Sequence, residues 1–496
     1  MAIFARRDIL RASAAAGVTA TVAPPLASAA EGSPGSGSQP PATGAASPPP
    51  PAVTQFLARK IVEARYEDIP AAVRREAVRT FLNWTGCAIG GSHHETISIA
   101  LSALRPFAGP AQATLLGRVD RIDIMHAAFL NGASSHVFDF DDTHLKTIIH
   151  PGGPVASALL AYAEYAPVNG KDFINALVLG VETECRLGNS VYPSHYALGW
   201  HITGTCGVFG AAAAVGKLLG LDEKQMAYAL GVAATQQTGL KIMFGSMTKS
   251  FHPGRAAESG MLAALLAAKG FTSSDKAIEG KDGWGGAVSP KQNWAEVVEG
   301  WGSRYEAALN TYKPFACGIV THPAIDGTIQ LRNEHRLTAE QIDRIELDVH
   351  PLVLSLTGKT EPQTGLEGKF SIYHIAAISL VQGKAGEKQF SDDAVRDPVI
   401  VSLRKKVTAA VDPSIKEDQA RIKIVLRDAR VVEKFIEHAV GSTTNPMSDQ
   451  MLEAKFTDLA EGILPSEQTR RLIEMCWRVE ELPSAGAIAQ AAAAVA

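Results

Sequence analysis

Two stretches in the first half of the chain, Lys171–Leu187 and Thr203–Leu219, are apolar on almost every side when placed on a helix. A surface helix keeps a polar face, so helices of this kind belong inside a large helical core. Helix-type spacing also runs through Asp222–Gln236 and Ala256–Lys269, and strand-type alternation is hard to find in this half. The sequence therefore predicts an all-helical first part.

The pattern changes after Tyr312. Ile342–Val349 and Ile422–Leu426 alternate as half-buried strands do, and Val431–Val440 is predicted to be a third strand. Ile375–Gln382 and Val395–Ala410 are predicted to be helices between these strands. The predicted fold class is mainly α with an α+β lid. It has a large all-helical domain formed by both ends of the chain (54–312 and 446–496) and a smaller inserted α+β lid domain (313–445).

The N-terminal segment is predicted to lie outside the fold. Arg6-Arg7 is a twin-arginine signature, followed by the weakly apolar Ala12–Pro24 and a small-x-small cleavage site at Ala27–Ala29. We expect a signal peptide over 1–29, a disordered Gly/Ser/Pro-rich linker over 30–53, and a periplasmic or secreted mature protein. The alternative is a chance Arg-Arg pair ahead of an Ala-rich tail.

Composition removes several classes of function. The 47 basic and 51 acidic residues nearly balance, at a net charge of −4, without a basic block, so we expect no nucleic-acid partner. No stretch is apolar for long enough to cross a membrane. The five cysteines form no Cys-x-x-Cys pair, which argues against a disulfide framework or a zinc ribbon. Dinucleotide, P-loop and serine-hydrolase motifs are absent from the sequence.

Polar residues concentrate in Asp139–Val155, between two predicted helices. We interpret this segment as the floor of an active site, in which His150 is the main acid/base, because His is the usual side chain for proton transfer near neutral pH. Five of its side chains could also ligate a divalent ion: Asp139, Asp141, Asp142, His144 and His150. Their spacing matches no familiar metal motif, and the cationic clusters elsewhere suit an anionic substrate without a metal. We therefore expect no metal, and leave His144 and Lys146 as rim residues.

Two further clusters precede predicted helices. Gly199–Thr205 places His201 at a helix N-terminus, where free N–H groups favour an anion; ordinary capping by Thr203 is the alternative. Ser246–Arg255 is interpreted as a shaped loop whose cations suit carboxylate groups, and a solvated basic loop is the alternative. Its three candidate ligands are Lys249, His252 and Arg255.

Two clusters lie in or beside the predicted lid. Lys313 and His322 flank the junction of the two predicted domains, a favoured place for ligand sites, although His322 could equally be a buried structural residue. Lys369–His374 opens a helix that could place Tyr373 or His374 over the site; a capped helix start with an exposed His is the alternative.

In this order, the clusters resemble the MmgE/PrpD family, which includes 2-methylcitrate dehydratase, cis-aconitate decarboxylase and an epimerase of iminodisuccinate. The resemblance covers Thr54 to Arg478. The matching pieces are Asp139–Thr143 with His150-Pro151, Gly199–Thr205, Thr248–Arg255, Lys313-Pro314 with Thr321–Asp326, Lys369–Ser371 and Asn445–Ser448.

The resemblance implies the same two-domain fold, a homodimer, and catalysis without a metal or organic cofactor. In the decarboxylase branch the site residues correspond here to Asp139, Thr143, His150, His201, Lys249 and His322. A lid tyrosine also acts there, and here either Tyr373 or His374 could stand at that position.

The expected activity is that of a cofactor-free lyase moving a proton next to a carboxylate of a small di- or tricarboxylic acid, by 2-methylcitrate-type dehydration or cis-aconitate-type decarboxylation. Asp139 would orient His150, Thr143 would hydrogen-bond the substrate, and His201 would stabilise charge or carry a second proton. Lys249, His252, Arg255 and Lys313 would hold carboxylates. An epimerase of an amino- or imino-dicarboxylate is the runner-up. An exported polycarboxylate-binding protein without catalysis is the alternative of another class, although solute-binding proteins normally repeat βαβ units.

Overall fold

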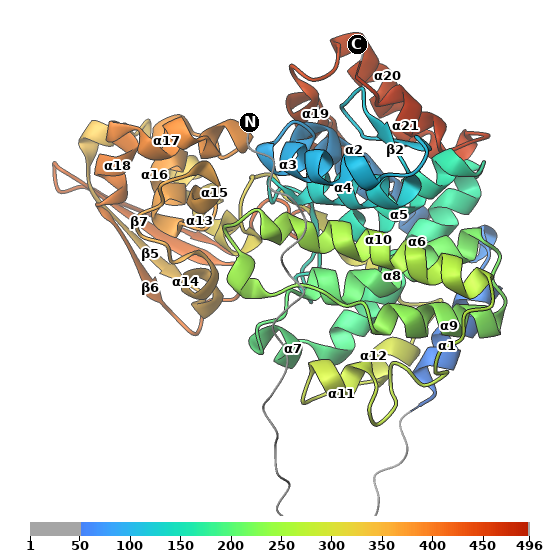
Figure 1. Cartoon of the computed structure of the whole chain (residues 1–496). Helices are drawn as coiled ribbons and strands as arrows, with labels where there is room; N and C mark the ends of the chain where they lie inside the picture. Colours follow the sequence, from blue (N-terminus) through green and yellow to red (C-terminus); the bar gives the residue numbers. More distant parts are fainter. Residues whose placement is uncertain (1–50, 495–496) are drawn as a thin grey trace, which may run out of the picture. The chain divides into compact units, whose positions relative to one another are not determined.

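The computed structural model describes residues 51–494, so the predicted signal peptide and most of the predicted linker lie outside the described residues. Helices dominate the first part of the described chain (Figure 1). The longer ones are α1 (Val53–Glu63), α2 (Ala71–Gly91), α3 (Glu95–Leu104), α4 (Ile124–His136), α5 (Gly152–Tyr165), α6 (Gly170–Val191), α8 (Ile202–Leu218), α9 (Glu223–Ala234) and α10 (Thr248–Ala268). Shorter ones are α7 (Ser194–Ala197), α11 (Trp284–Val288) and α12 (Ala295–Val298).

The two all-apolar helices occupy the centre, as predicted. Every residue of α8 from Ile202 to Gly216 is buried, and α6 is buried along nearly its whole length. Helix α8 packs against α5, α6 and α10, so it contacts helices on several sides and has no need of a polar face.

The C-terminal helices complete the helical part. They are α19 (Asp449–Ala460), α20 (Ser466–Trp477) and α21 (Ala487–Ala491), and α19 and α20 lie against α2 near the other end of the chain (Figure 1). Gly86 and Gly90 of α2 face Phe456 and Leu459 of α19 so closely that a Cβ would meet those side chains within 3 Å. The prediction of a helical part built from both ends of the chain is confirmed.

A four-stranded sheet forms the smaller part, in the order β6-β5-β7-β8. Its strands are β5 (Ile342–Val349), β6 (Val407–Val411), β7 (Ala420–Leu426) and β8 (Val431–Ile436). Strands β5 and β6 run parallel, and the other two neighbouring pairs run antiparallel. The accompanying helices are α13 (His322–His335), α14 (Pro351–Thr357), α15 (Gly365–Gly368), α16 (Ile372–Gln382), α17 (Asp392–Arg396) and α18 (Pro398–Arg404). The mainly α fold with a smaller α+β part agrees with the prediction, whereas the residue boundaries of the domains stay a prediction.

Two predicted elements were wrong. The stretch Val395–Ala410 is not one helix: it divides into the end of α17, α18 and strand β6. The basic segment before Ala256 is not a loop, because α10 already begins at Thr248 and continues through Pro253. Lys249 and His252 therefore lie one helical turn apart on a buried helix.

A close helix crossing fixes this part of α10 against α4. A Cβ on Gly254 would lie 2.3 Å from the carbonyl oxygen of Phe129, and one on Gly132 would lie 2.8 Å from the Cα of Gly254. Only glycine permits such an approach. The crossing brings Lys249 towards the segment that follows α4.

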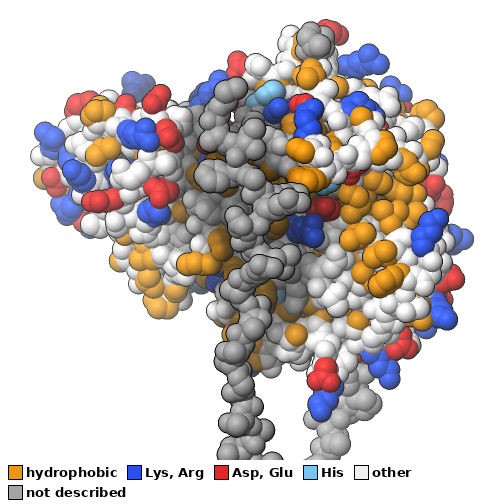
Figure 2. All heavy atoms as spheres, in the orientation of Figure 1, with side chains coloured by type: hydrophobic (Ala, Val, Ile, Leu, Met, Phe, Trp, Pro, Cys, Tyr) orange, Lys and Arg blue, Asp and Glu red, His pale blue; other side chains and the backbone are white. Residues whose placement is uncertain are grey.

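The surface seen in Figure 2 carries basic and acidic side chains interspersed over both parts of the molecule. Within residues 51–494, none of the helices is both long and apolar enough to cross a membrane. All five cysteines are buried and unpaired, as the spacing predicted.

Candidate active site

The segment between α4 and α5 folds into a tight, buried turn. Strand β3 (Asp142–His144) pairs antiparallel with β4 (Asn310–Tyr312), which ties the turn to the chain just before the sheet-containing part; a second short pair, β1 (Ala113–Thr114) and β2 (Arg121–Ile122), lies elsewhere. Asp139 and Ile148 have φ angles of 52° and 61°. Left-handed backbone is strained in a non-glycine residue, most of all in a β-branched one, and such strain concentrates at functional sites.

Asp139 binds two lysines through one oxygen. Its Oδ1 accepts from Lys313 Nζ at 2.6 Å and lies 2.8 Å from Lys249 Nζ, and Lys313 also donates to the Asp139 carbonyl oxygen at 2.9 Å. Burial alone would raise the pKa of Asp139, but the two ammonium groups outweigh it and hold that pKa well below its usual value. The carboxylate is therefore ionised, and two cations face one anion inside the protein.

His150 is oriented by its Nδ1. That nitrogen lies 2.8 Å from the carbonyl oxygen of Asp142, to which it donates, and 3.3 Å from Thr143 Oγ1. Nδ1 therefore carries a proton, and Nε2 is the nitrogen able to take one up. Burial, reinforced by the charge of Lys313, places the pKa of His150 well below its usual value, so the ring is neutral. Among the described residues no hydrogen bond joins Asp139 to His150, although an oxygen of Asp139 lies within 4.8 Å of a ring nitrogen of His150, so the orienting role of Asp139 stays a prediction.

A second histidine, His136 at the end of α4, was missed by the sequence reasoning. Its Nδ1 donates to Asp141 Oδ2 at 2.7 Å, and the other oxygen of Asp141 lies 3.4 Å from His150 Nδ1. The ring centroids of His136 and His150 are 4.7 Å apart. A single His at the end of an apolar helix gives no signal by itself; its place three residues before Asp139 was the only available hint.

His201 and His252 form a pair. Their Nδ1 atoms are 2.8 Å apart, so one donates and the other accepts. Burial lowers both pKa values, that of His252 to about 4. His252 is thus a partner of His201, and the substrate-binding role expected for it has no cavity-lining position to support it.

These groups surround a small inner cavity of about 30 Å³. Its lining includes Asp139, His150, His201, Lys249 and Lys313, together with three aromatic residues that the sequence reasoning did not select: Tyr196, Phe244 and Phe370. A volume of this size holds little more than a water molecule. The surrounding side chains must therefore move to admit an organic acid.

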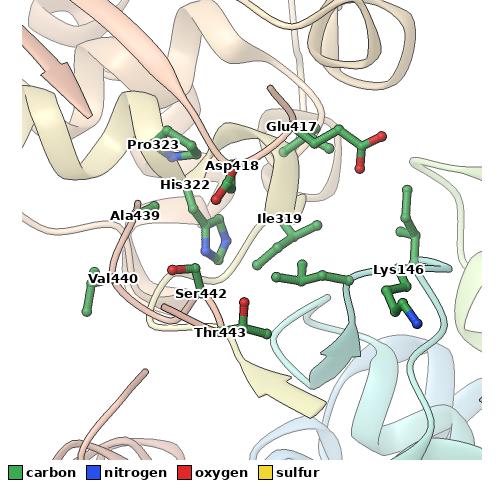
Figure 3. A pocket seen from close by; sticks show the side chains of 13 residues that line it. Lys146, Ile319, His322, Pro323, Glu417, Asp418, Ala439, Val440, Ser442 and Thr443 are labelled. Carbon is green, nitrogen blue, oxygen red and sulfur yellow. The ribbon is translucent and has the colours of Figure 1, made fainter. Parts of the chain in front are cut away.

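A larger outer pocket of about 270 Å³ adjoins the inner cavity, with Ile148, Ile319 and Val320 lining both. Figure 3 shows His322 on one side of this outer pocket and Lys146 on the other. His322 Nε2 lies 3.4 Å from the carbonyl oxygen of Cys317, and its buried Nδ1 has no hydrogen-bond partner within residues 51–494. His322 lines the outer pocket and does not line the inner cavity.

Besides His252 and His322, four further expected site residues do not line the inner cavity. Thr143 is fully buried behind His150. Arg255 pairs with Glu258 at 2.7 Å and its side chain is 43% exposed. Tyr373 lines a separate surface pocket, and His374 is buried against Phe390. The lid helix α16 thus points both residues away from the site.

The expected rim residues have structural partners. His144 Nε2 lies 3.1 Å from Glu306, and Lys146 lies 3.4 Å from the same carboxylate. Asp142 is fully buried and accepts hydrogen bonds from the Gly152 N–H and from Asn310. None of these three lines the inner cavity.

In the part of the chain that the structure describes, one cluster of side chains has the geometry to hold a metal ion. One ring nitrogen from each of His136, His150 and His201 lies within 4.8 Å of the others, and Asp139 and Asp141 lie close to the first two. All of these side chains are buried.

Both halves of the described chain match models of one protein family. The MmgE/PrpD N-terminal domain matches residues 55–297, and the MmgE/PrpD C-terminal domain matches residues 315–480. The chain belongs to the MmgE/PrpD family.

Similar proteins cover most of the chain. A cis-aconitate decarboxylase-like protein, oryM, of Aspergillus oryzae is 28% identical over 85% of this chain and 93% of its own length. Cis-aconitate decarboxylase of Aspergillus terreus is 26% identical over 84% and 91%. The 2-methylcitrate dehydratase of Salmonella typhimurium is 22% identical over 81% and 89%.

Proposed function

We propose that this MmgE/PrpD-type enzyme is a lyase that moves a proton at a carbon next to a carboxylate of a small di- or tricarboxylic acid. The observation that carries the proposal is the convergence of Lys249 and Lys313 on one oxygen of Asp139, in the same cavity as His150 and His201. The names of the similar proteins support the class, since they act on cis-aconitate or 2-methylcitrate.

Lys249 and Lys313 bind a carboxylate group of the substrate. In the free enzyme the two ammonium groups share one carboxylate oxygen, so they have capacity for a second anion. A substrate carboxylate placed beside them gains charge-assisted hydrogen bonds in a site with little water, where such interactions are strong.

His150 transfers the proton. Its neutral ring presents Nε2 as the base in the free enzyme. The negative charge of a bound polycarboxylate offsets the positive charge of the two lysines and so raises the pKa of His150. The ring can then hold the proton that it takes from the substrate and return it. Thr143 and the Asp142 carbonyl keep the ring in this orientation.

His201 is the candidate second proton carrier, because it lines the same cavity and is held by His252. Tyr196 also lines the cavity, whereas Tyr373 does not. We therefore propose Tyr196 as the hydroxyl group that contacts the substrate. These side chains provide the acid/base groups and the positive charge for the reaction without a cofactor.

Decarboxylation and dehydration share this proton step. We favour cis-aconitate-type decarboxylation because the decarboxylase relatives are 26–28% identical to this chain and the dehydratase 22%. The geometry of the inner cavity serves either reaction.

The proposal is tested by incubating the protein with cis-aconitate, 2-methylcitrate, citrate and iminodisuccinate and following each acid by NMR. Loss of CO₂ or of water from one of the first three supports a lyase. An inverted stereocentre without loss of either favours an epimerase. Tight binding of an acid without any chemical change contradicts the proposal and favours a binding protein.

A further inference from the structure

We propose that His136, His150 and His201 form a binding site for a divalent transition-metal ion, and that the bound ion inhibits the enzyme. The binding site rests on geometry alone. The inhibition rests on the proposed function, since it follows from the proton-transfer role given to His150.

The three imidazoles are close enough to share one ion. A nitrogen of each ring lies within 4.8 Å of the other two, and the ring centroids of His136 and His201 are 5.8 Å apart. A tetrahedral zinc ion with Zn–N bonds of 2.0–2.1 Å needs nitrogens about 3.3 Å apart. Small rotations of the three rings would bring them to that separation.

Each ring is held through Nδ1. His136 donates to Asp141, His150 donates to the Asp142 carbonyl, and His201 pairs with His252. This is how metal-binding histidines are usually supported: a carboxylate, carbonyl or other polar group fixes one nitrogen and leaves the other for the ion. Nε2 is therefore the candidate ligand atom on His136 and His150, and also on His201 in the tautomer whose Nδ1 donates to His252.

An independent observation points to a ligand at His136 Nε2. His136 Nε2 is fully buried and has no hydrogen-bond partner among the described residues. Since His136 Nδ1 carries the proton, this nitrogen presents a lone pair to its surroundings. A buried unpaired acceptor is costly, and a metal ion would satisfy it.

The local charge permits a cation. The carboxylates of Asp139 and Asp141 balance the ammonium groups of Lys249 and Lys313, so a cation bound by the three imidazoles does not add to an unopposed positive charge. Imidazole nitrogens favour Zn²⁺, Cu²⁺, Ni²⁺ and Co²⁺ over Mg²⁺ or Ca²⁺. The site is thus suited to a late first-row ion.

Inhibition is expected because the ion and the substrate proton would use the same nitrogen, His150 Nε2. An ion on His150 Nε2 occupies the lone pair that accepts the substrate proton. It would also lie in the inner cavity between His150 and His201, where the substrate must bind. Substrate and metal therefore exclude each other.

The test is a titration of tag-free full-length protein with Co²⁺, whose visible absorption reports nitrogen coordination independently of turnover. We expect one Co²⁺ per chain, displaced by Zn²⁺. His136→Asn and His201→Asn should each weaken binding at least tenfold. His374→Asn is the matched control, because His374 is a buried histidine outside the cluster, and it should bind as the wild type does.

Asp141→Asn keeps all three ligands and covers the case in which a histidine variant fails to fold. Loss of the carboxylate behind His136 should weaken binding by about 10- to 100-fold. Absence of Co²⁺ absorption, or equal affinity in wild type and cluster variants, would overturn the site.

Zn²⁺ should inhibit turnover competitively with substrate, and a chelator should restore it. Activity that rises with Zn²⁺ overturns the inhibitory role. If no polycarboxylate is turned over but Co²⁺ binds as described, the proposed function fails and the metal site stands.

Discussion

At the scale of single residues, the site depends on one carboxylate oxygen shared by two lysines. Asp139 Oδ1 lies 2.6 Å from Lys313 Nζ and 2.8 Å from Lys249 Nζ. Removing either cation leaves one ammonium group to serve both Asp139 and a substrate carboxylate. Binding of the substrate carboxylate therefore depends on both lysines.

Lys249→Met should lower kcat/KM by about 10²- to 10³-fold, because a charged donor to the developing anion is lost from a buried site. Arg255→Met is the matched control. Its cation is half-exposed, pairs with Glu258 and does not line the cavity, so kcat/KM should stay near the wild-type value. Steady-state kinetics on the acid that is turned over measures both, and a larger loss from Arg255→Met than from Lys249→Met would contradict the site.

The ionisation of Asp142 should make the unfolding free energy of the protein depend on pH. Burial, with the negative charge of Asp141, raises the pKa of Asp142 from 3.8 to about 7. Between these values the folded chain keeps a proton that the unfolded chain has lost, so this group's contribution to stability falls as pH rises through that window. Asn cannot ionise and can still accept the hydrogen bonds from Gly152 and Asn310.

The difference in unfolding free energy between Asp142→Asn and the wild type should therefore shift in favour of the variant by about 2 kcal/mol when the pH is raised from about 5.5 to about 8.5. Chemical denaturation at the two pH values measures the change. A difference between variant and wild type that is the same at both pH values would show that Asp142 is already ionised at the lower one.

The sequence alone could identify charged and polar residues that cluster beside apolar helices. Five residues that the sequence selected from separate polar clusters all line the inner cavity: Asp139, His150, His201, Lys249 and Lys313. It could not identify His136 or Tyr196, because a lone His or Tyr among apolar neighbours has the pattern of a core residue. It also could not exclude Arg255, whose distance from the cavity is set by helix rotation.

At the scale of elements, helix α10 decides which cations face the site. Ser246–Arg255 was predicted to be a loop, yet α10 runs through Pro253 and places Lys249 and His252 on its buried side. Strand β6 was missed for a different reason: only Val407 of its five residues is buried, so the strand lacks the alternation that identified β5. An exposed edge strand containing two alanines gives little strand signal.

Removing the hydroxyl group should have different effects on kcat at Tyr196, on the short helix α7, and at Tyr373, on α16. Tyr196 lines the inner cavity and Tyr373 lines a separate surface pocket. Tyr196→Phe should lower kcat by about tenfold or more, since a hydroxyl contact to substrate is lost, and Tyr373→Phe should leave kcat near the wild-type value. Turnover of the two variants under saturating substrate decides between them. The reverse ranking would mean that α16 moves over the site during catalysis.

At the scale of the whole molecule, the two ends of the chain meet in the helical part and the sheet lies between them in sequence (Figure 1). This arrangement was predictable because strand-type alternation appears only after Tyr312, and the pattern is purely helical again from Met447. The homodimer implied by the family resemblance stays a prediction.

Export through the twin-arginine route also stays a prediction, and it rests on Arg6-Arg7 and the Ala27–Ala29 site. In a bacterial host with an active twin-arginine pathway, the wild-type chain should be found in the periplasm, shortened to begin near Ala30. A chain with both Arg6→Lys and Arg7→Lys should remain full-length in the cytoplasm. Cell fractionation with intact-mass measurement tests this, and a full-length, cytoplasmic wild-type protein would contradict it.

The central claim is that His150 moves a proton at a carbon of a small polycarboxylate. The most direct measurement is the reaction of cis-aconitate or 2-methylcitrate in deuterated water, read by NMR for wild type and His150→Gln. The account predicts turnover with deuterium at the carbon next to a carboxylate for the wild type, and a loss of at least about 10²-fold in that rate for His150→Gln. Deuterium incorporation at a near wild-type rate in a folded His150→Gln protein would contradict it.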